Sequence, residues 1–535
     1  MNENEKGVII AAAVPPTPSH PCLAHRRHGA ASRGSQVPRH SSQFEGRFGW
    51  LFRTLSPAHH SDLALNKLAE AMTAEAEADQ TPETIVDDEE NTGIFAGYTY
   101  FGQFLDHDLT FDPNSSLQKQ NDPEGLVNFR SPRFDLDSVY GRGPSDQPYL
   151  YADDGVHFLL GKPLTGSDFD PGTRDLPRNS PNFGEPARAL IGDPRNDENT
   201  IVSQFQSTLL RFHNRIADLL HSRNGSLPDF EMVQRQVRWH YQWAILHDFL
   251  PTMIGEDNVK AILPQFKVTG ADREVYKPEL KFYNWKKEPF IPIEFSAAVY
   301  RFGHSMVRPI YRLNAHTDRL MIFQAPTNDG DGIDHSLAGF RAIPENHAVD
   351  WTLYFHIEDR PHLGSTRIQS SYKLDTSLVN PLGHLPPSIA VNPSSLAARN
   401  LIRGQSMGLP SGQAVAAIMG EVPLSNEMLK IGKATESSTN DPLTPRLTDI
   451  SEEFRDNAPL WYYVLAEAQQ QFRKDDTPIR LGKVGGRIVG EVFMGLLFGD
   501  SHSYMRQSPF WRPLPNLTRK DRFGIAELIL AARGE

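Results

Sequence analysis

The segment GYTYFGQFLDHDLTFDP, at residues 97–113, carries more chemistry than any other part of the chain. In a helix, Gln103 and His107 are four residues apart and rise from one face, with Asp106 close to that face. Asp108 lies about 100° around the helix from His107, so side chains of this one helix can contribute to two separate sites. Burying such polar groups without partners costs roughly a few kcal/mol each, which argues against a plain core face. The alternative interpretation is an exposed Asp-His-Asp surface patch.

A second acidic cluster follows in SPRFDLDSVYG, at residues 131–141, where Asp135 and Asp137 alternate in a loop that contains proline. Hard oxygen ligands this close suit Ca²⁺ if another element and backbone carbonyls complete about six to eight contacts. Asp108 is the candidate outside ligand, and a solvated acidic loop is the alternative. The segment NDGDGID, at residues 328–334, has its glycines out of register for a calcium-binding EF-hand loop and is interpreted as a turn.

Three further segments place polar residues in special settings: GDPRNDEN at 192–199, AAVYRFGHSMVRP at 297–309 and AARNLIRGQSMGLP at 397–410. Arg195 and Glu198 precede a long amphipathic stretch, where they would also serve as a charge pair at a helix start. His304 stands on an otherwise apolar helix, as a core histidine or a ligand. Asn400 and Arg403 fall in a loop or at a helix end.

Composition limits the class of protein. The 535 residues are 39% apolar and 22% charged, as in soluble globular proteins. The net charge of −12 lacks the basic footprint of a nucleic-acid binder, which favours small-molecule partners. The single cysteine, Cys22, excludes an intramolecular disulfide framework and a thiolate metal cluster, so a metal must be held by nitrogen or oxygen.

Apolar periodicity predicts a mainly α fold: one large helical domain with long ordered loops and few short strands. In the best case, Ile201, Phe205, Leu209 and Phe212 form one stripe. The predicted helices are 61–77, 93–110, 199–222, 229–249, 295–306, 410–419, 448–473 and 484–498. Short hairpins are expected near 263–283 and 309–324.

The sequence also predicts how the chain is divided and where in the cell the protein is located. Residues 1–45 are predicted to form an extended or disordered arm and residues 46–535 the catalytic domain. The arm holds four histidines that could bind a metal, although a solvated tail is the preferred interpretation: His20, His25, His28 and His40. No apolar run approaches the roughly 20 residues that span a bilayer. The short apolar run at residues 8–14 makes a poor secretory signal, so a cytoplasmic location is the default expectation, with secretion by another route left open.

Taken together and in this order, the five segments resemble the animal-type haem peroxidases of the peroxidase-cyclooxygenase superfamily, over about residues 90–510. The resemblance identifies His107, Gln103 and Asp106 with the distal element and Arg195 with Glu198 as its Arg-x-x-Glu element. On the proximal side, the family's residues match Arg301, Gly303, His304, Asn400 and Arg403. The helix that follows Glu198 matches the family at Leu210, Arg211, His213, Asn214 and Arg215.

This resemblance implies a haem b cofactor, with His304 as the iron ligand and Asn400 accepting its Nδ1–H. It implies that His107 acts as general base and then acid on H₂O₂, and that Arg195 stabilises developing charge. Gln103 would order a water or bind a small anion. Asp106 and Glu198 match positions where family members form ester bonds to the haem. Asn199 stands where some members carry a methionine bonded to a haem vinyl, so that link is excluded here.

The resemblance also implies a Ca²⁺ site, with ligands from Asp108, the Ser131 hydroxyl, the Arg133 carbonyl, Asp135 and Asp137. The expected activity is reduction of H₂O₂ through a high-valent iron intermediate and oxidation of halides or phenolic and other organic donors. One alternative is a fatty-acid dioxygenase of the same superfamily. That activity needs a radical tyrosine three residues before the proximal histidine, where this chain has Arg301. A catalytically idle haem or adhesion protein is the other alternative.

Overall fold

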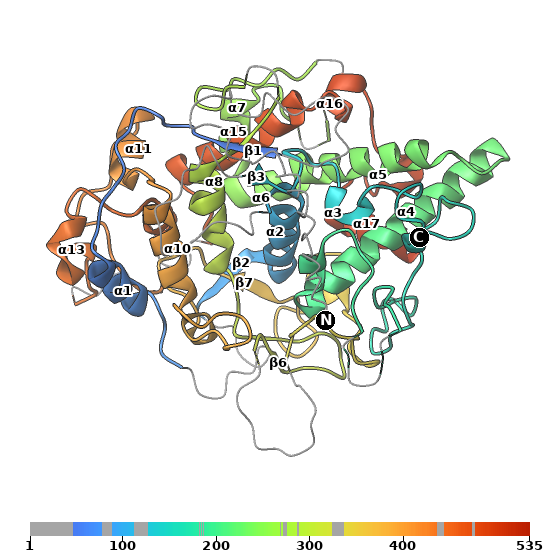
Figure 1. Ribbon diagram of the computed structural model, residues 1–535, viewed down its shortest axis with the longest axis horizontal. Coiled ribbons are helices and arrows are strands. Elements are labelled where there is room, and N and C mark those ends of the chain that lie inside the picture. The colour runs from blue at the N-terminus through green and yellow to red at the C-terminus, as the bar shows by residue number, and fades with distance from the viewer. Residues whose placement is uncertain are drawn as a thin grey trace, which may run out of the picture.

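Helices dominate the chain in this computed structural model, with a few two- to six-residue strands between them (Figure 1). The structure describes residues 46–76, 88–111, 127–180, 182, 185, 187–267, 269–270, 275–285, 288–323, 336–435, 443–472 and 477–534. The predicted arm, with its four histidines and Cys22, and the segment at 328–334 lie outside these residues. No helix within the described ranges is long and apolar enough to span a bilayer.

The main helices are α1 (Asp62–Ala71), α2 (Ala96–Leu109), α4 (Thr200–Asn224), α5 (Phe230–Ala244), α6 (Leu250–Ile254), α7 (Glu256–Ile262), α8 (Ile293–Ala297), α10 (Leu396–Ser406), α11 (Gly412–Ile418), α14 (Leu460–Gln469), α15 (Lys483–Gly499) and α17 (Ile525–Arg533). Shorter helices are α3 (Asp137–Tyr140), α9 (Asn380–Gly383), α13 (Leu447–Ile450) and α16 (Tyr504–Gln507). The strands are β1 (Gly46–Gly49), β2 (Glu90–Phe95), β3 (Val127–Asn128), β4 (Ile291–Pro292), β5 (Ile310–Tyr311), β6 (Leu320–Met321) and β7 (Ser370–Tyr372). A mainly α fold is therefore confirmed.

Helix α2 runs through the middle of the molecule (Figure 1). Strand β2 leads directly into it and pairs antiparallel with β7, which anchors its N-terminal end. The helix packs closely there, because a Cβ at Gly97 would lie 2.3 Å from the Phe355 ring. Aromatic side chains fill its surroundings, as where Phe101 meets Phe205 of α4 edge to face at 5.3 Å. The helix that carries the distal residues is thus held on several sides.

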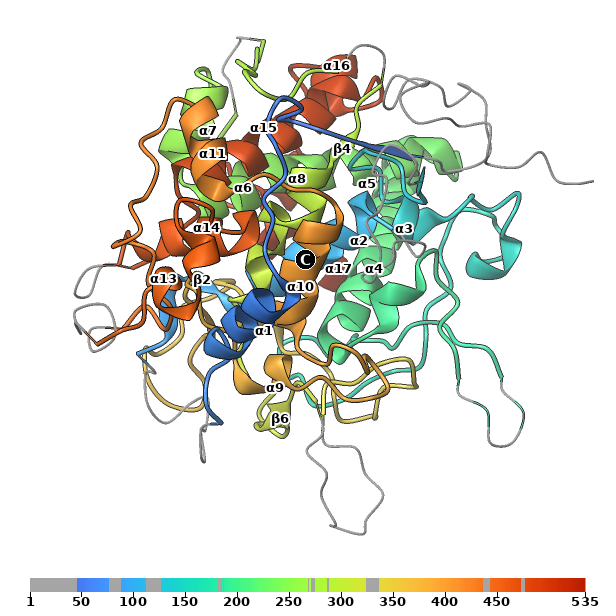
Figure 2. The ribbon, with the colours of Figure 1, turned by 60° about the vertical axis from the view of Figure 1, so that its left-hand side comes forward.

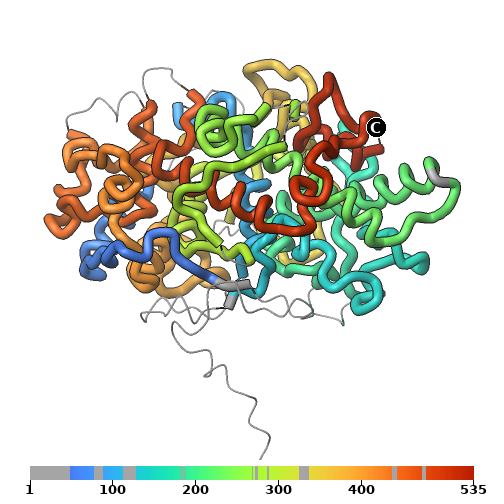
Figure 3. The backbone as a smooth tube through the Cα atoms, turned by 90° about the horizontal axis from the view of Figure 1, so that it is seen from above, coloured from blue at the N-terminus to red at the C-terminus, as the bar shows by residue number. Residues whose placement is uncertain are grey.

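Helix α4 confirms the predicted amphipathic stripe. Asn199 caps its start by accepting a hydrogen bond from the Val202 N–H at 3.0 Å. Ile201, Phe205 and Leu209 on the stripe are all at most 1% exposed. The C-terminal helix α17 packs on α4 (Figure 3), while α1 lies beside α10 on another face (Figure 2). One large cluster of buried apolar side chains connects these elements.

Several predicted elements differ in detail. The helix predicted at 448–473 is two helices, α13 and α14: the backbone is extended at Ser451 (φ −162°, ψ 138°), and α14 begins only after Pro459. The helix predicted at 295–306 is α8 followed by a 3₁₀ helix, η5 (Val299–His304), with the break at Ala298 (φ −135°, ψ −74°). The hairpin at 309–324 is confirmed by pairing of β5 with β6, whereas the described residues of 263–283 form no strand.

Candidate active site

The turn that carries His304 packs directly against helix α2. The Tyr300 hydroxyl of η5 donates a hydrogen bond to the Gly102 carbonyl of α2 at 3.2 Å. Most of α2 is buried, but Gln103 and Asp106 are only half-buried, as are Gly303 and His304 of η5. A Cβ built on Gly303 would meet no atom within 4 Å, so open space lies beside His304. Both elements therefore present partly exposed polar side chains.

Helix α10 contributes a third set of residues. Asn400 is buried and contacts His304, whereas Arg399, Ile402 and Arg403 are half-buried at a spacing of three and four residues. Burial lowers the pKa of Arg301, while the charge of Asp106 raises it and the like charge of Arg399 lowers it. Charges of both signs thus lie near Arg301.

On the distal side, five polar side chains form one cluster of hydrogen bonds and polar contacts. The Nδ1 atom of His107 lies 2.8 Å from Oδ1 of Asn196, and its Nε2 atom lies 3.4 Å from Oε1 of Glu198. Gln103 donates its amide N–H to the same Glu198 oxygen. The Gln103 carbonyl in turn accepts from Asn199 at 3.2 Å. The structure therefore brings together Gln103, His107 and Glu198, as the sequence predicted.

Arg195 is placed differently from Gln103 and Glu198. Its guanidinium bonds both oxygens of Asp193, at 3.2 and 2.8 Å, and donates to the His107 carbonyl at 2.9 Å. It also lies 4.5 Å from the centre of the Phe111 ring. Arg195 thus contacts the backbone side of His107 and the end of α2, whereas the predicted charge stabilisation would require it on the imidazole side.

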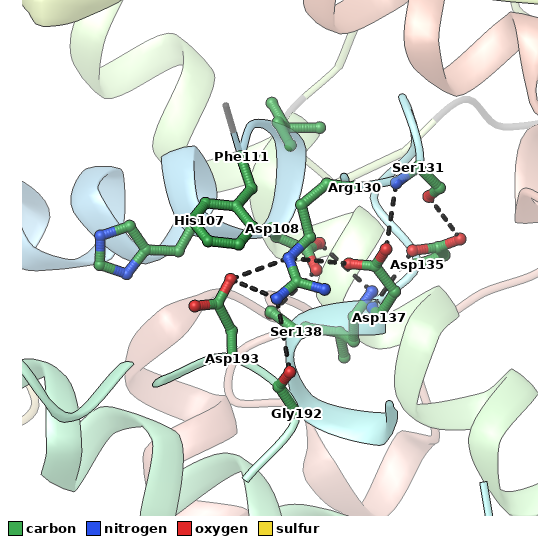
Figure 4. A network of polar contacts seen from close by, with 12 residues as sticks. His107, Asp108, Phe111, Arg130, Ser131, Asp135, Asp137, Ser138, Gly192 and Asp193 are labelled. Atoms are coloured by element: carbon green, nitrogen blue, oxygen red, sulfur yellow. Dashed lines mark hydrogen bonds and ion pairs between the residues drawn. The ribbon is translucent and has the colours of Figure 1, made fainter. Parts of the chain in front are cut away.

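Asp193 and Asn196 are site residues that sequence reasoning missed. Asp193 is fully buried and also receives two hydrogen bonds from Arg130 (Figure 4). Burial alone would raise the pKa of Asp193, but the hydrogen bonds and charges of Arg195 and Arg130 outweigh it and lower this pKa to about 2. Both residues stand in the quoted segment GDPRNDEN, so their polar character in a helix-start motif was the available signal.

On the proximal side, the predicted contact between His304 and Asn400 is present with its polarity reversed. Nδ2 of Asn400 lies 2.8 Å from Nδ1 of His304, so the amide presents its donor, where the sequence analysis expected its oxygen as acceptor. The reason is Arg301, whose guanidinium donates to Oδ1 of Asn400 at 3.2 Å. Burial, followed by the Arg301 charge, lowers the pKa of His304 to about 3, which keeps the imidazole neutral.

Asp106 on α2 and Arg403 on α10 are both half-buried. Oδ1 of Asp106 accepts a hydrogen bond from the Thr110 hydroxyl at 3.0 Å, one turn further along α2. Its charge is close enough to raise the pKa of Tyr300, although burial is the larger cause. Arg403 lies one turn after Asn400 on α10. Asp106 and Glu198 thus come from different segments, as the proposed pair of ester positions requires.

The predicted acidic cluster assembles as a unit. Asp108, Asp135 and Asp137 each offer an oxygen within 4.8 Å of the others. The Ser131 hydroxyl donates to Asp135 at 2.8 Å, and its N–H donates to Asp137 at 3.0 Å (Figure 4). Leu136 holds a left-handed backbone (φ 56°) from which its N–H reaches Asp108 at 3.2 Å.

Burial disfavours the ionised form of these carboxylates when no cation accompanies them. Burial, with the charge of Asp135 second, raises the pKa of Asp108 to about 7 and that of Asp137 well above its ordinary value. Oδ1 of Asp137 is buried without a hydrogen-bond partner. The remaining predicted ligand is the backbone carbonyl of Arg133. The guanidinium of Arg133 donates a hydrogen bond to Glu288 at 2.9 Å. The donor set consists of hard oxygens suited to a divalent cation.

Comparison with known proteins agrees with this geometry. The family model described as animal haem peroxidase matches residues 114–428, more than half of the chain, and the chain belongs to this family. The matched region contains the acidic loop, Arg195, His304 and Asn400, and begins just after α2.

The similar proteins include both peroxidases and a dioxygenase. The chorion peroxidase of Drosophila melanogaster is 31% identical over 132 residues, which cover 24% of this chain and only 15% of that protein. Peroxidase A from Dictyostelium discoideum has a similar fold, with a TM-score of 0.57 at 16% identity over 90% of this chain and 95% of that one. A fatty acid alpha-dioxygenase of Oryza sativa gives 0.52 at 14% identity, over 92% of this chain and 80% of that one. The chain thus shares its fold with both of these solved structures.

The residues present fit a haem. His304 carries a neutral imidazole, and a Cβ built on the neighbouring Gly303 would meet no atom within 4 Å. His107 stands on the other element, with a polar cluster around its Nε2 atom. One histidine to bind iron and a second, separately held histidine form the donor set that haem peroxide chemistry needs.

Proposed function

We propose that this protein is a haem peroxidase that reduces H₂O₂ and oxidises small electron donors, either halides or phenolic and other organic compounds. One observation carries the proposal: His107 and His304 lie on two elements joined at Tyr300 and Gly102, and each has its Nδ1 atom 2.8 Å from a buried asparagine. The ring orientation of both histidines is therefore fixed. When bound, haem supplies an iron that takes up peroxide and exchanges electrons.

His304 would hold the iron through Nε2. That use of Nε2 leaves the ring proton on Nδ1, so the Asn400 amide must turn its oxygen toward His304 and release the hydrogen bond from Arg301. An acceptor at Nδ1 makes the imidazole a stronger donor to the metal. Arg301 would then be available to a negatively charged group at the proximal edge of the cofactor.

On the distal side, His107 moves the proton. Its Nε2 atom would accept a proton from H₂O₂ and return it to the leaving oxygen, as general base and then general acid. Gln103 lies one turn before His107 and would order a water or small anion there. Arg195, once turned from Asp193, would stabilise negative charge on the leaving oxygen; in its present contact it fixes the end of α2 instead.

Two further features belong to this proposal. We infer a Ca²⁺ ion at Asp108, Asp135 and Asp137, with the Ser131 hydroxyl and the Arg133 carbonyl as added ligands.

We also propose ester links from Asp106 and Glu198 to the haem. Acid-acetone extraction of peroxide-treated protein, followed by mass spectrometry, should leave haem on the peptides that contain these residues. Complete extraction of unmodified haem b would refute the links alone.

The dioxygenase alternative is disfavoured by the position of the tyrosine. Arg301 occupies the site three residues before His304, and Tyr300 directs its hydroxyl to the Gly102 carbonyl. The test is an assay of the haem-loaded protein with H₂O₂ and guaiacol or iodide, beside an assay with fatty acid and O₂. Peroxide-dependent oxidation of guaiacol or iodide supports the proposal. Oxygen uptake with fatty acid, without any peroxide-dependent oxidation, would replace it with the alternative.

A further inference from the structure

Asn196 contacts His107 at Nδ1, whereas Glu198 lies near Nε2 of the same ring. The Oδ1 atom of Asn196 lies 2.8 Å from Nδ1 of His107, and both side chains are buried. An amide oxygen only accepts hydrogen bonds, so Nδ1 of His107 must carry the ring proton. A neutral imidazole has one such proton, which leaves the lone pair on Nε2. That nitrogen is the one on the Glu198 side, at 3.4 Å from its carboxylate oxygen.

Asn196 is itself held rigidly. Its Nδ2 atom donates to Oε1 of Gln206 on α4 at 2.9 Å, and its oxygen faces His107. Its backbone N–H bonds the Asp193 carbonyl at 3.1 Å inside the short 3₁₀ helix η3 (Pro194–Asp197). The amide has no solvent on either side, because Asn196 is 0% exposed.

The 3₁₀ helix is also fixed at its far end. The Phe340 N–H bonds the Asp197 carbonyl at 2.6 Å, and Arg178 bonds both oxygens of the Asp197 carboxylate at 2.7 Å. Gly339 approaches so closely that a Cβ there would lie 1.9 Å from the Asp197 carbonyl. A turn held in this way keeps the Asn196 oxygen in place when His107 gains or loses a proton at Nε2.

We propose that Asn196 is the positioning residue of the distal site: it holds His107 in the Nδ1–H form and directs Nε2 at the incoming peroxide. The inference rests on the proposed peroxidase function. An amide oxygen suits this role because it accepts the Nδ1–H and so orients the ring. The sequence motif shared with the family names Arg195 and Glu198, and Asn196 stands between them.

The test compares haem-loaded wild type with Asn196→Ala, Asn196→Asp and Asn128→Ala. Asn128 is the matched control: it is fully buried and bonds Leu109 and Phe111 at 2.7 Å at the end of α2, with no contact to an imidazole. Two bimolecular rate constants are measured: that of the first spectral change with H₂O₂ and that of the Soret shift on cyanide binding. Cyanide binds as HCN and must give its proton to a nearby base, so its rate reports on Nε2 without turnover. The melting temperature of each variant is recorded.

Asn196→Ala is expected to slow both reactions by about 10- to 100-fold, while the later donor-oxidation step keeps its rate. Asn196→Asp keeps an acceptor at Nδ1 and should restore most of the loss, with the Gln206 amide turning to face the second carboxylate oxygen. Asn128→Ala should lower the melting temperature and leave both rate constants unchanged.

Wild-type rate constants in Asn196→Ala would overturn the inference. So would an Asn196→Asp variant as slow as the alanine variant, or equal slowing in Asn128→Ala, since that would show a general effect of disturbing α2. If wild type shows no spectral change with H₂O₂, the proposed function fails, and the cyanide rate constants still decide whether Asn196 positions His107.

Discussion

The Tyr300 hydroxyl donates to the Gly102 carbonyl at 3.2 Å and so joins the 3₁₀ helix of the proximal histidine to the helix of the distal one. Gly102 precedes Gln103 directly, and Tyr300 precedes His304 by four residues. The Tyr300 ring stacks on Phe295 at 4.7 Å, which fixes the phenol. The chain itself therefore sets the separation of the two histidines, and the phenol has a structural task.

Tyr300→Phe should consequently preserve function. Losing one hydrogen bond is expected to lower the free energy of unfolding by about 1 kcal/mol, as measured by urea denaturation. The Soret band and the peroxide-dependent oxidation of guaiacol should remain. If this substitution abolished oxidation while haem stayed bound, Tyr300 would be a redox residue and the dioxygenase-like alternative would gain support.

Gly303→Ala tests where the haem lies. The added methyl group would meet no atom within 4 Å in the cofactor-free protein, so the melting temperature of that form should be unchanged. The same methyl enters the space beside His304 and should weaken haem binding by at least about tenfold in a titration followed at the Soret band. Unchanged haem affinity would place the cofactor elsewhere.

Asp193→Asn tests the buried charge that holds Arg195. The pKa of Asp193 is lowered from 3.8 to about 2 in the folded protein, so its contribution is present above about pH 4 and is lost as the pH falls toward 2. A shift of this size corresponds to about 2 kcal/mol. Urea denaturation should therefore show the variant less stable than wild type at neutral pH, with the difference shrinking below pH 4. A difference that is constant over this range would contradict the account.

The acidic cluster predicts a stabilising cation. Ca²⁺ at about 100 times its Kd should raise the free energy of unfolding by about 3 kcal/mol, because the ion binds only the assembled cluster. Asp137→Asn should reduce this gain, whereas Asp146→Asn, at a surface carboxylate with 54% of its side chain exposed, should not. Since Asp108 adjoins His107, chelation should also slow the reaction with peroxide. A melting temperature indifferent to both Ca²⁺ and chelator would refute the site.

Local sequence spacing was enough to predict part of the site. Gln103 and His107 share a helix face because they are four residues apart, and the alternating Asp135 and Asp137 form a loop that meets Asp108. The amphipathic stripe of α4 predicted its burial equally well, from residues such as Phe205.

Contacts between distant segments were beyond this reasoning. The pairing of Asn196 with His107 joins residues 89 positions apart, and the orientation of the Asn400 amide depends on Arg301 from another element. Helix breaks were missed for a different reason: apolar periodicity continues through Ala298, where the backbone leaves the α region. Periodicity reports which residues are buried and says little about where the backbone turns.

The most direct test of the central claim is an absorption spectrum of haem-reconstituted protein before and after H₂O₂, recorded for wild type, His304→Ala and His107→Ala. Wild type should show a Soret band that shifts with peroxide. His304→Ala should lose the band or release its haem, and His107→Ala should keep the band but react about 100- to 10,000-fold more slowly. A normal spectrum in His304→Ala, or an unchanged peroxide rate constant in His107→Ala, would contradict the assignment of these two histidines.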